Sequence, residues 1–413
     1  MRSCKIFTAF LFIIFIIVLC TACEMQGTKK DSAQIAQPSS VKAVPSTDYS
    51  SIERRITQRC EEIVSLYYDL YICAEKNEPE SPWDEPTLQQ SSIDAIESLL
   101  IENSLDVIDT NGAYPEYLTT ADHFQVFWTC VQRKEDSEQE IISIAKSGAL
   151  NYRLFSYQDG IPYVYFKYYP MGNSSNAYFE PHRVLDWELT EKGNFFYRIY
   201  PANDKHYADY SLIRMNAPDL TLYDMTMKYI WAGDYMATNI FLVDWTEDDF
   251  ESLCFNDLWD AFYYDCYGQQ FDPDGYDYEP ERRCYMIPSA QFEEIVLPYF
   301  NIELDAFRQM AQYDAEKDGY PWRKIVTNDL VFLYYYSCEP EVSSYRANDD
   351  GTLTLTVEAI STDLKLDCLF AHEVTVRPLK DGSFQFVGNK VTYQTEYGLP
   401  FCESRLSWDP SWS

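Results

Sequence analysis

Apolar residues recur at three- and four-residue steps between residues 51 and 76, and this periodicity predicts an amphipathic helix. Ile56, Cys60, Ile63 and Tyr67 fall on one side of it, and charged residues fall on the other. The same pattern predicts further helices at 92–103, 121–132 and 138–146. Aromatic and β-branched residues then fill 151–157 and 163–169 on either side of a Gln-Asp-Gly turn, which predicts a β-hairpin.

The order of helices followed by strands returns further along the chain. Strands are predicted at 183–190 and 194–200, with more between 220 and 245. Helices follow at 248–264, from 289 onward and at 304–312, and then strands at 330–336, 352–359, 372–377 and 383–391. Helices that precede antiparallel strands, instead of alternating with them, indicate an α+β fold. Because 413 residues exceed what one hydrophobic core usually serves, we expect two such domains, at 50–245 and 246–413.

The N-terminus has the features of a secretory signal. Arg2 and Lys5 precede an apolar run over 6–20, and small residues stand directly before Cys23. This arrangement predicts a signal peptide over 1–22, a lipid attached to Cys23 and a polar tether over 23–49. Cys20 stands where Leu is usual, and an uncleaved apolar anchor is the alternative. Either arrangement places the folded region on the extracytoplasmic face of a membrane.

The composition adds a strongly acidic surface rich in tyrosine. The formal net charge is −34, and the chain contains 35 Tyr, 24 Phe and 9 Trp. A surface of this sign repels nucleic acid phosphates, so we exclude nucleic acid as a partner. Solubility alone can explain the charge, and attraction of cations or basic partners is the alternative. Amphipathic rings suit half-buried sheet faces, glycan platforms and protein interfaces.

Nine cysteines follow Cys23, at positions 60, 73, 130, 254, 266, 284, 338, 368 and 402. Their number is odd, and none forms a C-x-x-C pair, so neither a zinc knuckle nor a thioredoxin-type site is indicated. We expect most of them to be buried free thiols. One or two disulfide bonds among them are the alternative.

The sequence contains none of the common catalytic or cofactor-binding motifs considered next. His123, His182, His206 and His372 are far apart, and no H-E-x-x-H, G-x-S-x-G or phosphate-binding glycine loop is present. We therefore predict no cofactor, no metal and no identifiable catalytic site. Carboxylates are so abundant that a glycosidase-like pair stays open as an alternative.

One segment combines aromatic and acidic residues and is the candidate binding surface. Its members are Trp259, Tyr263, Tyr264, Tyr267, Asp272, Asp274 and Asp277. Oxygen ligands at alternate positions around Gly275 could also suit Ca²⁺, although the spacing differs from that of an EF-hand. An ordinary acidic loop is the simpler interpretation.

Two segments carry a family resemblance. Residues 285–302, and 348–357 continuing through 372–379 and 386–390, resemble uncharacterised lipoproteins of clostridia and related Firmicutes. The likeness extends over roughly residues 245–395. It implies a lipid-anchored protein in a Gram-positive-type envelope and assigns no activity and no site residues. Our hypothesis is a binding or protein-interaction module for an envelope protein or glycan, with a carboxylate-based hydrolase as the alternative.

Overall fold

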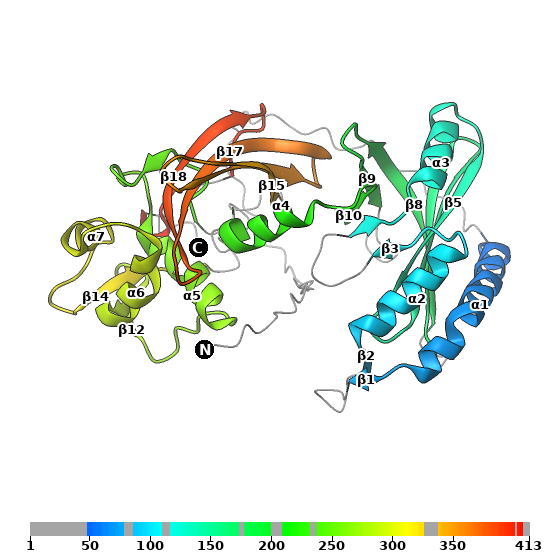
Figure 1. The fold of residues 1–413 in the computed structure, drawn as a ribbon, viewed down its shortest axis with the longest axis horizontal. Helices are drawn as coiled ribbons and strands as arrows, with labels where there is room; N and C mark the ends of the chain where they lie inside the picture. Colours follow the sequence, from blue (N-terminus) through cyan, green and yellow to red (C-terminus); the bar gives the residue numbers. More distant parts are fainter. Residues whose placement is uncertain are drawn as a thin grey trace, which may run out of the picture. The chain divides into compact units, whose positions relative to one another are not determined.

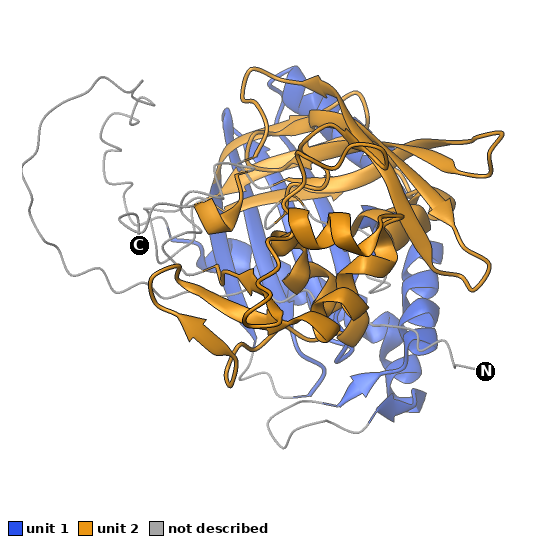
Figure 2. Ribbon diagram, turned by 90° about the vertical axis from the view of Figure 1, so that its left-hand side faces the viewer, with its two compact units in different colours: residues 1–183 blue, residues 184–413 orange. Residues whose placement is uncertain are grey.

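The structure is a computed structural model that describes residues 48–77, 86–109, 116–172, 177–199, 209–231, 235, 238–325, 338–400 and 403–407. The chain divides into two compact units, residues 1–183 and 184–413 (Figure 2). Both combine helices with antiparallel sheets, so the α+β class is confirmed. The domain boundaries that we placed at 49 and 245 stay predictions.

Three helices of the first unit match the sequence expectation: α1 (Ser50–Cys73), α2 (Gln90–Glu102) and α3 (Asp122–Gln132). α1 and α2 lie side by side (Figure 1) and share one hydrophobic cluster. Ile56, Cys60, Ile63 and Tyr67 are the buried residues of α1, as the periodicity predicts. Tertiary packing therefore reinforces the amphipathic pattern of the sequence.

The prediction of a helix at 138–146 is wrong. This segment forms strand β5 (Ser137–Ile144), which pairs with β6 (Leu150–Gln158) along its full length. Ile141, Ile142 and Ile144 are fully buried there, because the β-branched side chains pack well on a covered sheet. Local periodicity cannot separate a short helix from a buried strand of this kind.

The predicted hairpin is confirmed as β6 and β7 (Ile161–Tyr169), joined by Asp159 and Gly160 with φ angles of 50° and 77°. Strand β8 (Tyr178–Leu189) pairs with β7 through its first half and with β9 (Asn194–Ile199) through its second half. The boundary between the two units falls inside β8. The remaining short strands of the first unit are β1 (Lys76–Asn77), β2 (Thr87–Leu88), β3 (Ile108–Asp109) and β4 (Tyr117–Leu118).

In the second unit, helix replaces the expected strands over 220–230, and turns occupy 240–242. After β10 (Asp209–Arg214) come α4 (Leu220–Met225), a π-helical turn η2 (Thr226–Ile230) and the short strand β11 (Trp245–Thr246). The Asp219 carboxylate caps α4 by accepting from the backbone N–H groups of Thr221 and Leu222. This cap favours the start of a helix, and the prediction of strands did not take it into account.

The helix expected at 248–264 begins later than predicted. Turns at 247–248 and 251–252 come first, followed by the 3₁₀-helix η4 (Phe255–Leu258) and by α5 (Trp259–Tyr267). Gly268 ends α5 in the left-handed region, at φ 66°. The predicted later helices are confirmed as α6 (Ser289–Val296) and α7 (Leu304–Met310), with the short η5 (Leu297–Tyr299) between them.

Two sheets complete the second unit. The sequence did not predict the smaller one, of β12 (Asp277–Glu279), β13 (Cys284–Pro288) and β14 (Gly319–Trp322). The larger sheet has the order β11-β18-β17-β16-β15 and is antiparallel throughout. Its long strands are β15 (Glu339–Ala347), β16 (Leu353–Ser361), β17 (Leu366–Pro378) and β18 (Phe384–Gln394). The expected strand at 330–336 lies outside the described residues.

The eight cysteines that the structure describes are all free thiols. Cys60 and Cys284 are buried, whereas Cys73 and Cys266 are exposed and the other four are intermediate. The expectation that most cysteines are buried is therefore wrong for this set. Cys402 lies outside the described residues.

Candidate functional site

The predicted binding residues occupy α5, the loop after it and the first residue of β12. Tyr264 and Tyr267 are 49% and 52% exposed. Asp272, Asp274 and Asp277 are also exposed, and Tyr263 is half-buried. Trp259 is different, because its side chain is fully buried in the core. The structure therefore places six of the seven residues at or near the surface.

A chain of ring contacts joins Tyr263 and Tyr267 on α5 to the loop that follows. The ring centroid of Tyr263 lies 4.7 Å from that of Tyr267 and 5.2 Å from that of Phe271. Phe271 in turn contacts Tyr276 at 5.0 Å and Trp322 at 5.0 Å. The aromatic side chains thus form one continuous layer across the helix and the loop.

A further exposed ring lies in the same acidic segment, although it is not among the seven candidate residues. Tyr278 on β12 is 49% exposed and contacts Tyr285 at 4.9 Å. Tyr285 contacts Trp322 at 6.1 Å, which connects it to the same aromatic layer. The contact between Tyr278 and Tyr285 depends on the pairing of β12 with β13, which the local sequence does not specify.

We call this surface the tyrosine platform. It consists of the exposed and half-buried candidates Tyr263, Tyr264, Tyr267, Asp272, Asp274 and Asp277 together with Tyr278, although Asp277 and Tyr278, as neighbours on β12, lie on opposite faces of that strand.

The buried side chain of Trp259 packs against the rings of the platform. Its indole stacks on Phe292 with a centroid distance of 5.4 Å, and it contacts Phe271 and Tyr263 at 5.2 and 5.5 Å. Trp259 and Phe262 are the buried residues of α5, and because they lie one helical turn apart they share the side of the helix that faces the core. Its Nε1 has no hydrogen-bond partner among the described residues. The sequence interpretation of Trp259 as a surface residue is thus corrected.

The acidic loop has a defined turn geometry. The Asp272 carboxylate accepts from the backbone N–H of Asp274 at 3.0 Å, and Gly275 adopts φ 95°. Tyr276 donates its hydroxyl to Gln291 Oε1 at 2.9 Å, which ties the loop to α6. Over the described part of the chain, no group of three or more His, Cys, Asp or Glu side chains is arranged to hold a metal ion.

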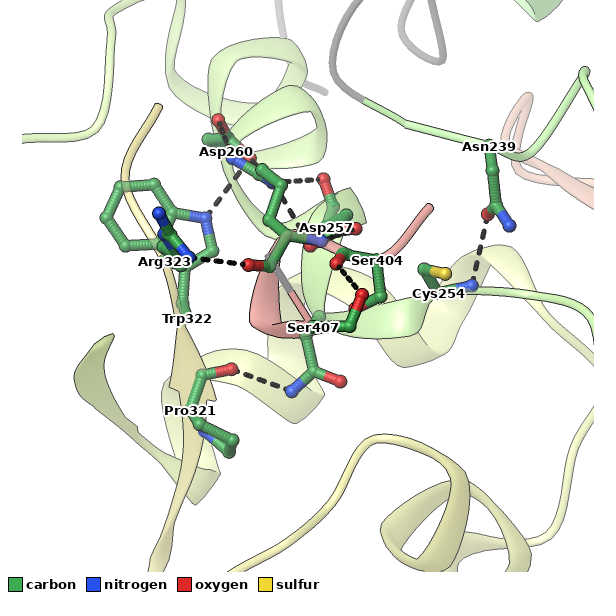
Figure 3. Close-up of polar contacts among 11 residues, drawn as sticks. Asn239, Cys254, Asp257, Asp260, Pro321, Trp322, Arg323, Ser404 and Ser407 are labelled. Atoms are coloured by element: carbon green, nitrogen blue, oxygen red, sulfur yellow. Dashed lines mark hydrogen bonds and ion pairs between the residues drawn. The ribbon is translucent and has the colours of Figure 1, made fainter. Parts of the chain in front are cut away.

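An ionic cluster fixes the N-terminal end of α5 and the segment just before it. Arg405 Nη2 donates to Asp260 Oδ1 at 2.7 Å, and Nη1 donates to Asp260 Oδ2 at 3.1 Å. Its Nε and its backbone N–H donate to the two carboxylate oxygens of Asp257, at 3.1 and 3.0 Å. Trp322 also donates its indole N–H to Asp260 (Figure 3). The C-terminal residues 403–407 are thereby joined to the base of the platform.

The buried opposite charges of this cluster stabilise the local structure. Burial raises the pKa of Asp257 to about 6, while the adjacent Arg405 guanidinium acts in the opposite direction. The Arg405 side chain is 1% exposed, and the two carboxylates hold its pKa above the ordinary value. Arg405 engages both carboxyl groups, so this pair beside Trp322 is not free to serve as a general acid and base.

Each of the three described histidines has local contacts of its own. His372 is fully buried between Tyr235 and Asn389, and its pKa falls to about 4 because burial disfavours the charged form. His123 is largely exposed and contacts the buried Asp106 carboxylate at 3.0 Å. His182 is buried near Glu180, and His206 lies outside the described residues. These contacts make His372 and His123 parts of separate local networks.

Residues 1–47, which include Cys23, lie outside the described residues. Within the described ranges, no helix combines the length and apolar character that a membrane span requires.

Comparison with known proteins places the chain in a family. A family of unknown function, DUF6070, matches residues 53–405, a wider range than the resemblance noted over 245–395. No curated protein and no solved structure matches the chain. Because the match extends over both units, the chain belongs to this family of unknown function.

Proposed function

We propose that this protein is a membrane-tethered binding module of the cell envelope whose contact surface is the tyrosine platform. The observation that supports this function is the exposure of Tyr267 and Tyr278, whose rings are connected through one layer of ring contacts. Tyr264 is also exposed on α5. Exposed tyrosines supply large contact areas and lose little side-chain entropy on binding, and they are enriched at protein interfaces.

The rigidity of the platform supports the same conclusion. Its rings pack on Trp259, Phe271 and Trp322, which are all buried. The Arg405 cluster holds the N-terminal end of α5 in place through Asp260. A surface that is already ordered loses less entropy when a partner binds, so weak individual contacts can add up to specific binding.

The N-terminal sequence supports the proposed location at a membrane. A basic start, an apolar run and small residues before Cys23 form the pattern of a lipoprotein signal. In the proposed arrangement a lipid on Cys23 anchors the chain, residues 24–49 form the tether, and the folded units lie outside the cytoplasm. The partner is an envelope protein or glycan.

Site-specific photocrosslinking tests the contact surface. A photoreactive phenylalanine derivative replaces Tyr267 in the full tethered chain, and the matched control carries it at Tyr345, which is 48% exposed on β15. We expect a discrete adduct from position 267 in the native envelope and none from position 345. Equal adducts at both positions, or none at either, would refute the platform as the contact surface.

The anchor has its own test. Cys23→Ala should abolish incorporation of a palmitate label and release the protein from the membrane fraction. Full labelling and unchanged membrane association of the variant would contradict lipidation at this residue. Loss of the label with retained association would indicate the uncleaved apolar anchor.

A further inference from the structure

We infer that the second unit contains a binding site for an arginine residue of a peptide segment, and that Arg405 occupies it as an intramolecular ligand. Another arginine-bearing segment can enter this site only in place of Arg405. We call it the arginine site, and it is formed by Asp257, Asp260, Trp322 and Arg323. The inference goes beyond the proposed function, because it concerns a buried site and not the tyrosine platform.

The arginine site engages every nitrogen atom of the guanidinium. Nε donates to Asp257 Oδ1 and Nη1 donates to Asp260 Oδ2, both at 3.1 Å. Nη2 donates to Asp260 Oδ1 and to the backbone carbonyl of Asp257, both at 2.7 Å. The ring of Trp322 adds a cation–π contact, with its centroid 5.7 Å from the guanidinium carbon. This set of acceptors matches the planar fork of an arginine and not the ammonium group of a lysine.

The site also contacts the backbone of the same residue. The backbone N–H of Arg405 donates to Asp257 Oδ2 at 3.0 Å, and its carbonyl oxygen accepts from Arg323 Nη1 at 3.3 Å (Figure 3). A free guanidinium ion offers neither of these groups. The ligand that satisfies the whole site is therefore an arginine with peptide bonds on both sides.

Other contacts hold the acceptors of the site in place. Asn256 is buried and donates through Nδ2 to the backbone carbonyls of Ala311 and Pro321, both at 2.7 Å, which fixes η4. The buried indole of Trp322 donates its N–H to Asp260 at 3.2 Å. A site that is ordered by such contacts needs little rearrangement when its ligand binds.

The C-terminal segment 403–407 is attached through this one residue. Arg405 is 1% exposed, whereas the other four residues of the segment are exposed or half-buried. Among the described residues, every hydrogen bond between the segment and the rest of the chain is made by Arg405. The remaining hydrogen bonds of the segment join Ser404 and Ser407 to each other. A single buried anchor among near-neutral neighbours is typical of a bound peptide.

The carboxylates explain why the site requires a cation. The Asp257 side chain is 4% exposed and that of Asp260 is 25% exposed. Negative charges in such surroundings are unfavourable without a partner, so a vacated site regains its ion pairs by binding another arginine. Arg405 competes with any such ligand at a high effective concentration, because it belongs to the same chain. The attached segment therefore closes the site to other peptides.

The test opens the site and adds the ligand back. The full chain with Arg405→Ala is prepared in detergent micelles, and thermal unfolding is followed by circular dichroism as ligand is added. The ligands are the N-acetyl, N-methylamide derivatives of arginine, lysine and citrulline, the last of which replaces the guanidinium with an uncharged urea group. The matched control is Arg377→Ala, because Arg377 also binds a carboxylate through two nitrogens, that of Glu247, but is 32% exposed.

We expect the arginine derivative to raise the unfolding midpoint of Arg405→Ala with a Kd of about 1 mM. The lysine and citrulline derivatives should bind about tenfold more weakly, since neither combines the charge with the planar fork. The native protein should show no shift because its own arginine fills the site, and Arg377→Ala should show none because its vacated position is open to water.

Arg405→Lys serves as a second variant, because it keeps a cation in the site and preserves the fold if Arg405→Ala does not. The arginine derivative should raise its midpoint as well, since the lysine side chain matches the acceptors less well than the ligand does.

The absence of a shift in every folded Arg405 variant, at ten times the expected Kd, would overturn the inference. Equal shifts with the lysine or citrulline derivative would also overturn it, because the site would then not select a guanidinium. An equal shift in Arg377→Ala would do the same, because any vacated carboxylate would then suffice. A retained photocrosslink at position 267 leaves the proposed function standing in each of these cases.

Discussion

His372 allows a quantitative prediction about the pH dependence of folding. Asn389 donates its amide N–H to the carbonyl of Val243 at 2.8 Å, so its Oδ1 accepts from His372 Nδ1 at 2.7 Å. Nε2 is then the acceptor for the hydroxyl of Tyr235 at 2.8 Å. Because both ring nitrogens are engaged and the ring is fully buried, the imidazole is held in one neutral tautomer.

The magnitude follows from the two pKa values. Burial lowers the pKa of His372 from 6.5 to about 4, so between these values the unfolded chain binds a proton that the folded chain does not. The stability due to the neutral imidazole is present above pH 6.5 and is lost as the pH falls toward 4. From pH 7 to pH 5 the loss amounts to about 2 kcal/mol of unfolding free energy.

Urea unfolding at pH 7 and pH 5 measures this loss in the native protein and in His372→Gln. Glutamine keeps one donor and one acceptor but cannot take up a proton in this range. The native protein should lose about 2 kcal/mol more than the variant between the two pH values. Asp257 acts with the opposite sign, since its raised pKa gives stability that is lost as pH rises through about 6. That contribution cancels in the comparison.

A parallel loss of stability in both proteins would refute the reasoning about His372. Nitrogen NMR of the folded native protein gives a second check on the same residue. The His372 ring should keep the shifts of a neutral imidazole until the pH approaches 4. A midpoint near 6.5 would show that the ring is not held neutral.

Three further substitutions test the packing around the platform. Arg405→Ala leaves the buried Asp257 carboxylate without its cation and should lower the unfolding free energy by about 3–5 kcal/mol; an effect below about 1 kcal/mol in urea unfolding would contradict the stabilising role of this ion pair. Trp259→Ala removes a fully buried indole and should cost about 3–5 kcal/mol in the same assay, whereas a neutral effect would argue for a surface position. Gly319→Ala places a Cβ 2.7 Å from the Ile287 carbonyl oxygen, so thermal unfolding should show a loss of about 1–3 kcal/mol; an unchanged melting temperature would speak against this close strand approach.

The sequence by itself determined the elements whose signals are local. α1 and α2 follow from helical periodicity, and the hairpin of β6 and β7 follows from alternating aromatic residues around Asp159 and Gly160. Each of these segments buries one face, so the order of its own residues carries the information. The α+β class and most of the platform residues could be predicted for the same reason.

Tertiary structure decided what depends on partners distant in the sequence. β5 is a strand because β6 pairs with it, although its isoleucine spacing also fits a helix. Trp259 is buried because Phe292 and Phe271 cover it, and Tyr278 joins the platform only through β13 and β14. The partner of Asp257 and Asp260 lies far along the chain at Arg405. Burial and ion pairing are properties of contacts between segments, which no local pattern of residues specifies.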